Sequence, residues 1–406
     1  MPRKVVIVGG GQAGFQVAAS LRGKGFDGSI SIVAEEAAPP YQRPPLSKAY
    51  LKGEASESSV LLRPLEFFAN HAIDLRLDTR VASIDRGERC AVLPDGSALA
   101  YDSLVLATGA RVRKLPVPGA ELAGVVYVRT LADAVALKPL LAAARDVVVI
   151  GGGFIGLECA SVAAALGHHT TVLEAADRLM ARVVSPVLSS YYRDLHMGHG
   201  VDVRLGATVT ELAGSGGAVT GVCCDDGTVV AADLVIVGIG VIPNDGLAKA
   251  AGLACDRGIV VDATLRTADP DIAAIGDCAA FPHPMARGLL RLESVQNAVD
   301  QGKTVADAIL GDAKPYTAVP WFWSDQYDVK LQIVGICQDY DDTLTLGEAG
   351  DGRFSVLYFR QGNLIAIDSV NKAGDHMAGR KLFGAGRTVT IVQARAAGFD
   401  LRAAAK

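Results

Sequence analysis

Apolar and small residues follow the same order in two distant parts of the chain. The apolar run 5–8 leads into the glycine-rich run 9–14, and the run 147–150 leads in the same way into 151–156. Each copy is typical of a buried strand, a G-x-G-x-x-G turn and the start of a helix. Because glycines lack a Cβ atom, backbone N–H groups and the helix N-terminus can approach a pyrophosphate there. The pattern therefore predicts two dinucleotide-binding units.

An acidic residue closes the next apolar run after each glycine turn, about twenty residues further on. These residues are Glu35 and Glu174. A carboxylate at this place accepts hydrogen bonds from a ribose but repels a 2′-phosphate, so Glu174 favours NADH over NADPH. Arg178 and Arg182 follow closely, either weakening that preference or lying solvated on the surface.

The remaining pattern divides the chain into domains. A proline-rich stretch over residues 37–48 excludes a helix interior until about Ser47. Two buried strands that end in small residues, 101–109 and 234–240, mark where the chain leaves the first nucleotide unit and where it returns. Alternating strands followed by a helical tail predict a third unit near the C-terminus. We expect an α/β fold with two Rossmann-like dinucleotide-binding domains and a C-terminal α+β domain, with boundaries at 1–112 plus 245–319, 113–244 and 320–406.

Composition narrows the class of protein. A chain of 406 residues, 50% of them hydrophobic, is long enough for more than one core. A net charge of −5 gives no basic stripe, so we expect no nucleic-acid partner. The seven cysteines show neither zinc spacing nor C-x-x-C, so no metal site is expected. Without an export signal or an apolar run of about 18 residues, we expect a cytoplasmic protein with no membrane partner. The sequence does not decide between a monomer and a weak dimer.

Further motifs carry a resemblance to a known family. The segment 107–109 reads Ala-Thr-Gly, and 273–277 reads Ala-Ala-Ile-Gly-Asp. Together with the paired glycine turns, they resemble the two-dinucleotide-binding-domain flavoproteins of the disulfide reductase superfamily, with a glutathione-reductase-like fold. Within that superfamily, 43–48 and 320–326 resemble the oxygenase-coupled ferredoxin reductases, the putidaredoxin reductase-like branch.

The resemblance implies FAD at the first glycine turn and NAD, as NADH, at the second. The FAD contacts it implies are Gly9, Gly11, Ala13, Gly14, Glu35, Lys48, Val81, Ala107, Thr108, Gly109, Arg129, Gly276, Asp277, Val295 and Trp323. The NAD contacts it implies are Gly151, Gly153, Phe154, Ile155, Gly156, Glu158, Glu174, Arg182, Gly238 and Gly240.

The resemblance also implies catalytic roles for Lys48, Glu158 and Trp323. In related enzymes a lysine after the proline-rich loop pairs with a glutamate beside the flavin N5 atom, where a cation stabilises negative charge on the reduced ring. A purely structural ion pair is the alternative. Trp321 and Trp323 are the only tryptophans, and we expect their side chains to point to opposite faces of one strand, with Trp323 as the functional one. A buried anchoring role for one of the two is the alternative explanation.

The lack of a cysteine in the N-terminal part of the chain bears on the route of the electrons. No cysteine precedes Cys90, whereas the superfamily's thiol-using members carry theirs in the stretch that residues 41–48 occupy here. Electrons must then leave the flavin singly for a one-electron acceptor. The resemblance implies a 2Fe-2S ferredoxin that feeds a haem-thiolate monooxygenase or a ring-hydroxylating dioxygenase. Reduction of rubredoxin or another small carrier is an alternative, and a redox-signalling protein similar to apoptosis-inducing factor is another.

Overall fold

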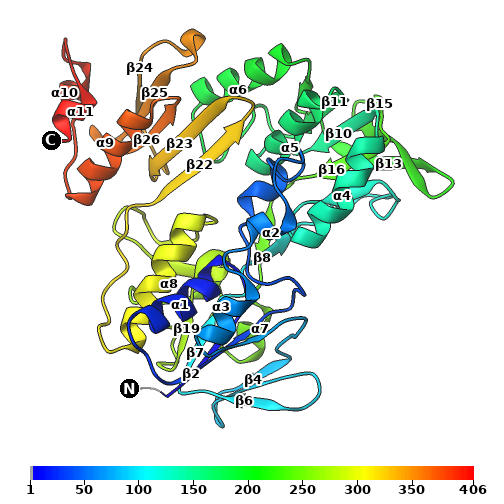
Figure 1. Ribbon diagram of the computed structural model, residues 1–406. Coiled ribbons are helices and arrows are strands. Elements are labelled where there is room, and N and C mark those ends of the chain that lie inside the picture. The colour runs from blue at the N-terminus through cyan, green and yellow to red at the C-terminus, as the bar shows by residue number, and fades with distance from the viewer. Residues whose placement is uncertain (1–2) are drawn as a thin grey trace. The chain divides into compact units, whose positions relative to one another are not determined.

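The structure, a computed structural model, describes residues 3–406 and divides them into two compact units (Figure 1). Unit 1 contains residues up to 42, 58–111 and 242–322, and unit 2 contains 43–57, 112–241 and 323–406. Four short elements contain residues of both units: α2 (Glu57–Val60), β8 (Ala110–Val112), β17 (Val241–Pro243) and β22 (Trp321–Gln326). No helix among residues 3–406 is long and apolar enough to cross a membrane.

Unit 1 is built on a parallel sheet with the order β19-β7-β1-β2-β3. Its central strand holds four buried residues in a row, as a strand covered on both faces requires. Helices α1 and α8 lie side by side in this unit (Figure 1). The strands are β1 (Lys4–Val8), β2 (Ser29–Val33), β3 (Ile73–Arg76), β7 (Ser103–Leu106) and β19 (Ile272–Ala274), and the helices are α1 (Gln12–Gly23), α3 (Leu65–Asn70), α7 (Gly246–Ala250) and α8 (Val295–Ile309).

Two small sheets complete unit 1. An antiparallel meander between β3 and β7 consists of β4 (Ser83–Asp85), β5 (Cys90–Val92) and β6 (Ala98–Ala100). The other sheet consists of β18 (Ile259–Val260), β20 (Ala279–Pro282) and β21 (Leu289–Leu290).

Unit 2 repeats this plan. Its parallel sheet has the order β12-β11-β10-β16-β9, and an antiparallel meander, β13-β14-β15, lies between β12 and β16 in the chain, as β4-β5-β6 lies between β3 and β7. The strands are β9 (Val125–Tyr127), β10 (Asp146–Ile150), β11 (His169–Glu174), β12 (Asp202–Leu205), β13 (Val209–Ser215), β14 (Ala218–Cys224), β15 (Val229–Ala231) and β16 (Leu234–Val237). The helices are α4 (Leu131–Ala143), α5 (Phe154–Ala165) and α6 (Pro186–Gly198).

The C-terminal part of unit 2 is a sheet with the order β22-β23-β26-β25-β24, along which α9 packs (Figure 1). Strand β25 is buried on both faces, and most of its side chains are apolar. It therefore lacks the alternation of apolar and polar residues that is typical of a strand with one exposed face. The strands are β23 (Val329–Gly335), β24 (Asp342–Leu346), β25 (Phe354–Arg360) and β26 (Asn363–Val370), and the helices are α9 (Ala373–Gly384), α10 (Ile391–Arg395) and α11 (Leu401–Ala404).

The proline-rich stretch contains one short helical element. Pro44–Ser47 forms a 3-10 helix of four residues, and its prolines occupy the first turn, so the expected exclusion of a helix interior is not contradicted. Prolines are tolerated in the first turn of a helix, where their missing N–H groups have no intrahelical partner anyway.

A buried polar cluster joins the C-terminal sheet to the nucleotide-binding part of unit 2. Tyr358 on β25 donates its hydroxyl proton to Asp368 on β26 and accepts the backbone N–H of Ser185 at 2.9 Å. Ser185 is the residue that precedes the first turn of α6. Burial raises the pKa of Asp368 to about 7, although the hydrogen bond from Tyr358 opposes that shift. This buried environment therefore favours the neutral carboxylic acid of Asp368 over its carboxylate.

We expect Asp368→Asn to remove a pH dependence of stability. An unfolded aspartate ionises near pH 3.9, and the pKa in the fold is about 7. Between these values the unfolded state loses its proton first, so stability falls as the pH rises, and the full loss is present above about pH 7. The asparagine variant cannot ionise and should unfold at a higher temperature than the parent at pH 8, with a smaller difference at pH 4.

Thermal unfolding of both proteins from pH 4 to pH 9 measures this difference. The exposed carboxyl of Glu348 provides the matched control, because Glu348→Gln removes a charge from the same sheet region without removing a buried one. Parallel pH curves for Asp368→Asn and the parent would contradict a neutral-range titration of Asp368.

Candidate cofactor and redox site

The first glycine turn lies in unit 1 between β1 and α1 and permits a very close approach of backbones. Gly9 has φ +120°, and a Cβ atom there would lie 2.1 Å from the carbonyl oxygen of Ala107. A Cβ atom on Gly14 would lie 2.1 Å from the carbonyl oxygen of Gly9. At Gly11, by contrast, a Cβ atom would meet nothing within 4 Å. Two of the three glycines are therefore required by the fold itself, and Gly11 leaves an open cradle at the start of α1.

The second glycine turn, in unit 2, has the same geometry. Gly151 has φ +107°, and its Cβ atom would lie 2.5 Å from the carbonyl oxygen of Gly238. A Cβ atom on Gly156 would lie 2.1 Å from the carbonyl oxygen of Gly151, and Gly153 again faces open space. Two cradles of the same shape, one in each unit, fit two pyrophosphates.

Two side chains that sequence reasoning missed organise the loops of unit 1. Asn244 donates its amide N–H to the carbonyl oxygen of Thr108 at 2.9 Å, and Thr108 returns a hydrogen bond to the carbonyl oxygen of Asn244 at 2.6 Å. Gln301 accepts the backbone N–H of Gly276 at 2.7 Å. The Nε2 atom of Gln301 is buried without a partner among the described residues, which leaves a donor beside the Gly276–Asp277 turn.

The two acidic residues do not occupy equivalent places. Glu174 ends β11, and its carboxylate accepts the N–H of Gly152 at 2.6 Å and the N–H of Ala176 at 2.8 Å. The strand register makes Ala34 its counterpart in unit 1, so Glu35 lies one residue further on and is exposed. The regular spacing predicted a shared position, which a one-residue difference between the copies prevents.

The expectation that Arg178 is simply solvated on the surface is wrong. Its guanidinium donates to the carbonyl oxygens of Val184 and Ala181 at 2.8 and 2.6 Å and to the hydroxyl of Ser189 at 2.9 Å. Arg178 therefore ties the loop before α6 together and is not a solvated surface residue. Arg182 is exposed, and its guanidinium lies 3.5 Å from the position of a Cβ atom on Gly240.

The carboxylate of Glu158 on α5 collects three donors inside unit 2. The ammonium of Lys48 lies 2.8 Å from Oε1, the hydroxyl of Ser324 donates to the same oxygen at 2.7 Å, and the hydroxyl of Ser47 donates to Oε2 at 2.6 Å. Glu158 is 4% exposed, so this charge is almost completely removed from water. The structure thus brings Lys48 and Glu158 together and adds two serines that sequence reasoning missed.

Two buried cysteines lie next to residues of the expected sites. Burial raises the pKa of Cys159, the neighbour of Glu158, to about 12 and also raises the pKa of Cys278, the neighbour of Asp277. Both side chains are therefore neutral thiols at neutral pH, and neither is a thiolate nucleophile. All seven cysteines are free.

The other expected residues lie at the ends of secondary-structure elements. Trp321 and Trp323 are two residues apart on β22, so their side chains share one face of that strand, and both are partly exposed. The expectation that they point to opposite faces is therefore wrong, and neither side chain is a buried anchor. Arg129 precedes the capped N-terminus of α4, and its carbonyl oxygen accepts a hydrogen bond from Arg43 at 2.6 Å. Val295 is the first residue of α8.

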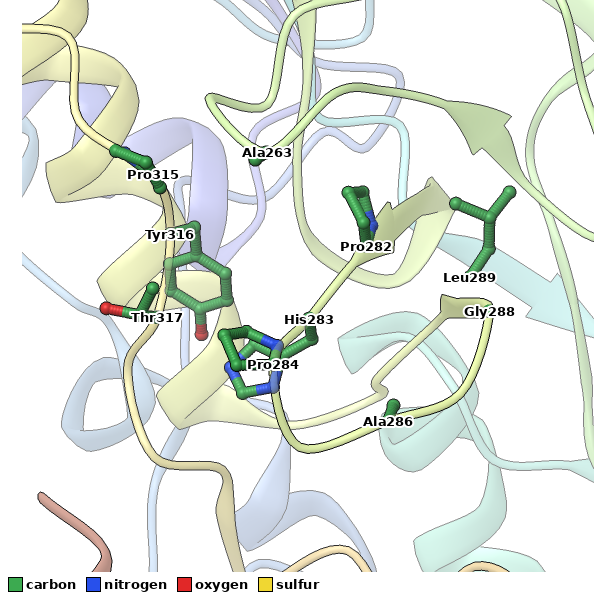
Figure 2. A pocket seen from close by; sticks show the side chains of 10 residues that line it. All are labelled: Ala263, Pro282, His283, Pro284, Ala286, Gly288, Leu289, Pro315, Tyr316 and Thr317. Atoms are coloured by element: carbon green, nitrogen blue, oxygen red, sulfur yellow. The ribbon is translucent and has the colours of Figure 1, made fainter. Parts of the chain in front are cut away.

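A pocket in unit 1 lies outside the glycine turns (Figure 2). Figure 2 shows His283 and Tyr316 among prolines and small residues that line it. His283 hydrogen bonds to the carbonyl oxygen of Ala318 at 3.2 Å, and Tyr316 donates to Asn297 at 3.1 Å. Burial also lowers the pKa of His283 and keeps it neutral. The polar groups of this pocket are thus engaged within the fold, which favours a structural role.

Comparison with known proteins decides the family. Residues 3–302 match the family described as pyridine nucleotide-disulphide oxidoreductase, and residues 321–405 match the family described as reductase C-terminal. The chain belongs to the pyridine nucleotide-disulphide oxidoreductase family. The expected fold class, two dinucleotide-binding units followed by a C-terminal α+β domain in a glutathione-reductase-like flavoprotein, is confirmed.

Several well-matched relatives are reductases of small redox proteins. Rhodocoxin reductase of Rhodococcus erythropolis is 48% identical over 400 residues, which cover 98% of this chain and 94% of that protein. Rubredoxin-NAD(+) reductase of Pseudomonas putida is 42% identical and covers 90% of this chain, with 95% of its own length matched.

Solved structures agree over the full length. The crystal structure of the ferredoxin reductase for the CYP199A2 system of Rhodopseudomonas palustris matches with a TM-score of 0.97, 49% identity and 100% of both chains. The covalent putidaredoxin reductase–putidaredoxin complex matches with a TM-score of 0.96, 41% identity and 99% of both chains.

This family member is an oxidoreductase that uses FAD and a pyridine nucleotide. The residues present fit both groups, because each unit offers an open cradle at Gly11 or Gly153. When bound, FAD supplies a ring that accepts a hydride and releases electrons one at a time. The chain's own part is to bind, orient and neutralise charge.

We expect Gly153→Ala to weaken nucleotide binding and Gly156→Ala to weaken the stability of the fold. Gly153 has φ −84° and open space, so alanine is tolerated by the fold but places a methyl group where the pyrophosphate of the pyridine nucleotide binds. The affinity for NADH should fall roughly tenfold or more. In Gly156→Ala the new Cβ atom meets the carbonyl oxygen of Gly151 at 2.1 Å, and stability should fall by about 1–3 kcal/mol.

Anaerobic titration with NADH and thermal unfolding measure the two effects, and the flavin absorbance of each purified variant verifies its FAD content. Unchanged NADH affinity in Gly153→Ala would show that the pyrophosphate binds elsewhere.

Proposed function

We propose that this protein is an NADH-dependent ferredoxin reductase that passes electrons through FAD to a 2Fe-2S ferredoxin, which in turn serves a haem-thiolate monooxygenase or a ring-hydroxylating dioxygenase. One observation carries the proposal. The stretch 41–48 contains no sulfur, and its last residue, Lys48, instead forms an ion pair with the buried Glu158. The names of the relatives, which include reductases of ferredoxins and of rubredoxin, support a small electron carrier as the acceptor.

In this proposal FAD binds the domain formed by residues 1–112 and 245–319, NADH binds residues 113–244, and residues 320–406 form the interface domain. Glu174 supports NADH over NADPH. Its carboxylate is fixed by the N–H groups of Gly152 and Ala176, where it would repel a 2′-phosphate. Arg178, which would be suited to bind such a phosphate, is engaged with backbone carbonyl oxygens of its own loop.

Lys48 and Glu158 are proposed to act on charge beside the flavin. The side chain of Lys48 is 17% exposed and that of Glu158 is 5% exposed, so their charges are weakly screened by water. An ammonium held there favours negative charge on the ring once it has accepted electrons. Glu158 holds the ammonium in place and keeps the buried cation paired.

Trp323 is proposed to contact the flavin edge and to lie on the path to the carrier. It shares the exposed face of β22 with Trp321, and aromatic side chains combine contact area with low conformational entropy at such surfaces.

Rubredoxin or another small carrier is the competing acceptor. The open cradles at Gly11 and Gly153 bear on which nucleotides bind, but they carry no information about the carrier protein. A slow, NADH-driven signalling protein similar to apoptosis-inducing factor is the alternative from another class. Fast carrier-dependent turnover supports the enzyme, whereas slow turnover with NADH-induced dimerisation supports the signalling protein.

We expect the protein to reduce a 2Fe-2S ferredoxin with NADH faster than rubredoxin with NADH, and faster with NADH than with NADPH. Trp323→Ala should slow ferredoxin-dependent cytochrome c reduction roughly tenfold and change reduction of a small dye little, because the dye needs no docking surface. Trp321→Ala is the matched control on the same face. Equal losses of Trp323→Ala in both assays would reject a role for Trp323 in the carrier step.

We expect Lys48→Met to slow anaerobic reduction of the flavin by NADH roughly tenfold or more, since the cation that stabilises the reduced ring is lost. Stopped-flow absorbance measures this rate. Because the unpaired Glu158 alone costs about 3–5 kcal/mol of stability, the double variant Lys48→Met with Glu158→Gln separates charge from folding. An unchanged rate of flavin reduction in both variants would show that the role of Lys48 is only structural.

A further inference from the structure

The carboxylate of Glu158 is the end of a longer chain of buried polar groups. Behind Ser324, the side chain of Gln326 donates to the Ser324 hydroxyl at 3.3 Å. Gln326 Oε1 lies 2.8 Å from His196 Nε2, and His196 Nδ1 lies 3.2 Å from the hydroxyl of Tyr327. Ser324, Gln326 and His196 are all 0% exposed. Burial of three such groups is unfavourable unless their hydrogen bonds are made, and here they are made to one another.

The charge of Glu158 fixes the direction of every bond in this chain. An ionised carboxylate only accepts, so Ser324 must donate its single proton to Glu158 and accept from Gln326. The amide nitrogen of Gln326 therefore faces Ser324, and its carbonyl oxygen faces His196. Burial lowers the pKa of His196 to about 4, while its hydrogen bond to Gln326 opposes that shift, so the ring is neutral at neutral pH. Its one proton lies on Nε2, and Nδ1 accepts from Tyr327.

All four hydrogen bonds thus point their protons toward Glu158. Aligned bonds of this kind reinforce one another in a dry interior. Oε1 of Glu158 accepts both from Ser324 and from the ammonium of Lys48, at 2.7 and 2.8 Å. Loss of the Ser324 hydroxyl would leave that oxygen with Lys48 alone and draw the ammonium further onto the carboxylate.

We propose that Ser324, Gln326 and His196 form a positioning relay that sets the place of the Lys48 ammonium through Glu158, and thereby tunes the reduction potential of the bound flavin. This inference rests on the proposed function, which places the Lys48–Glu158 pair beside the flavin ring. None of the three relay residues is expected to touch a cofactor. Their effect is exerted through Glu158, from strand β22 and helix α6, on a lysine of the segment before α2.

The test is a spectroelectrochemical titration of the flavin in the FAD-loaded protein, without NADH or carrier. Ser324→Ala should lower the midpoint potential, in the same direction as Lys48→Met but by less. Gln326→Met, which keeps the volume but removes the amide, should shift it in that direction as well. Ser324→Cys, which retains a weak donor, should restore part of the shift. Ser369→Ala removes another fully buried hydroxyl of the same sheet and should leave the potential unchanged.

A double-mutant cycle separates positioning from packing. If Ser324 acts through Glu158, Ser324→Ala has no further effect on the potential when Glu158→Gln is already present. In single-turnover reduction by NADH, Ser324→Ala should be roughly fivefold slower, a change that one hydrogen bond can supply.

The outcomes distinguish this inference from the function on which it rests. If Lys48→Met shifts the potential but Ser324→Ala and Gln326→Met do not, the relay is overturned and the proposed function stands. If Lys48→Met and Glu158→Gln also leave the potential and the reduction rate unchanged, the proposed role of the ion pair is overturned as well. Additive shifts of Ser324→Ala and Glu158→Gln would equally overturn the relay.

Discussion

A carboxylate that is buried away from water requires hydrogen-bond donors or a cation from the protein. In unit 2, the donors that Glu158 requires bring distant segments of the chain together. The carboxylate and its partners come from three parts of the chain: helix α5 carries Glu158, the segment before α2 carries Ser47 and Lys48, and strand β22 carries Ser324. Each part would leave a buried charge or hydroxyl unsatisfied without the others. The same requirement that holds these elements together also fixes an ammonium in a defined place, so the stability of the fold and the electrostatics of the proposed site have one origin.

The second constraint is the approach of backbones at the glycine turns. In both units the carbonyl oxygen of the residue that follows the neighbouring parallel strand, Ala107 or Gly238, occupies the space that a Cβ atom of the first glycine would fill. The middle glycine is spared this contact and faces open space instead. One glycine thus leaves room for a ligand, and the other two allow backbones to approach closely. Because the arrangement is the same in both units, it provides for two nucleotides in one chain.

Sequence reasoning succeeded where the constraint is local. The glycine turns, the strands that lead into them and the Ala107–Gly109 loop follow from residues that are close in the sequence. The pairing of Lys48 with Glu158 came from a resemblance, because nothing in the spacing of two distant residues indicates contact. Ser324, Gln326 and His196 escaped notice for the same reason: serine, glutamine and histidine carry no pattern until folding brings them together. The spacing also did not reveal that Glu35 lies one residue beyond the position equivalent to Glu174, because one residue of difference after a strand is too small to recognise in the pattern.

The anchoring of Glu174 has a consequence for altering coenzyme choice. Its two oxygens link the glycine turn after β10 to the loop after β11, because one accepts the N–H of Gly152 and the other the N–H of Ala176. Replacing Glu174 by a basic residue, in order to bind a coenzyme with a 2′-phosphate, would also remove the hydrogen-bond acceptor of these two N–H groups. A change of coenzyme preference therefore requires a second substitution that supplies a new acceptor from a neighbouring position. Without it, the backbone around Gly152 and Ala176 would lose the hydrogen bonds that hold its shape.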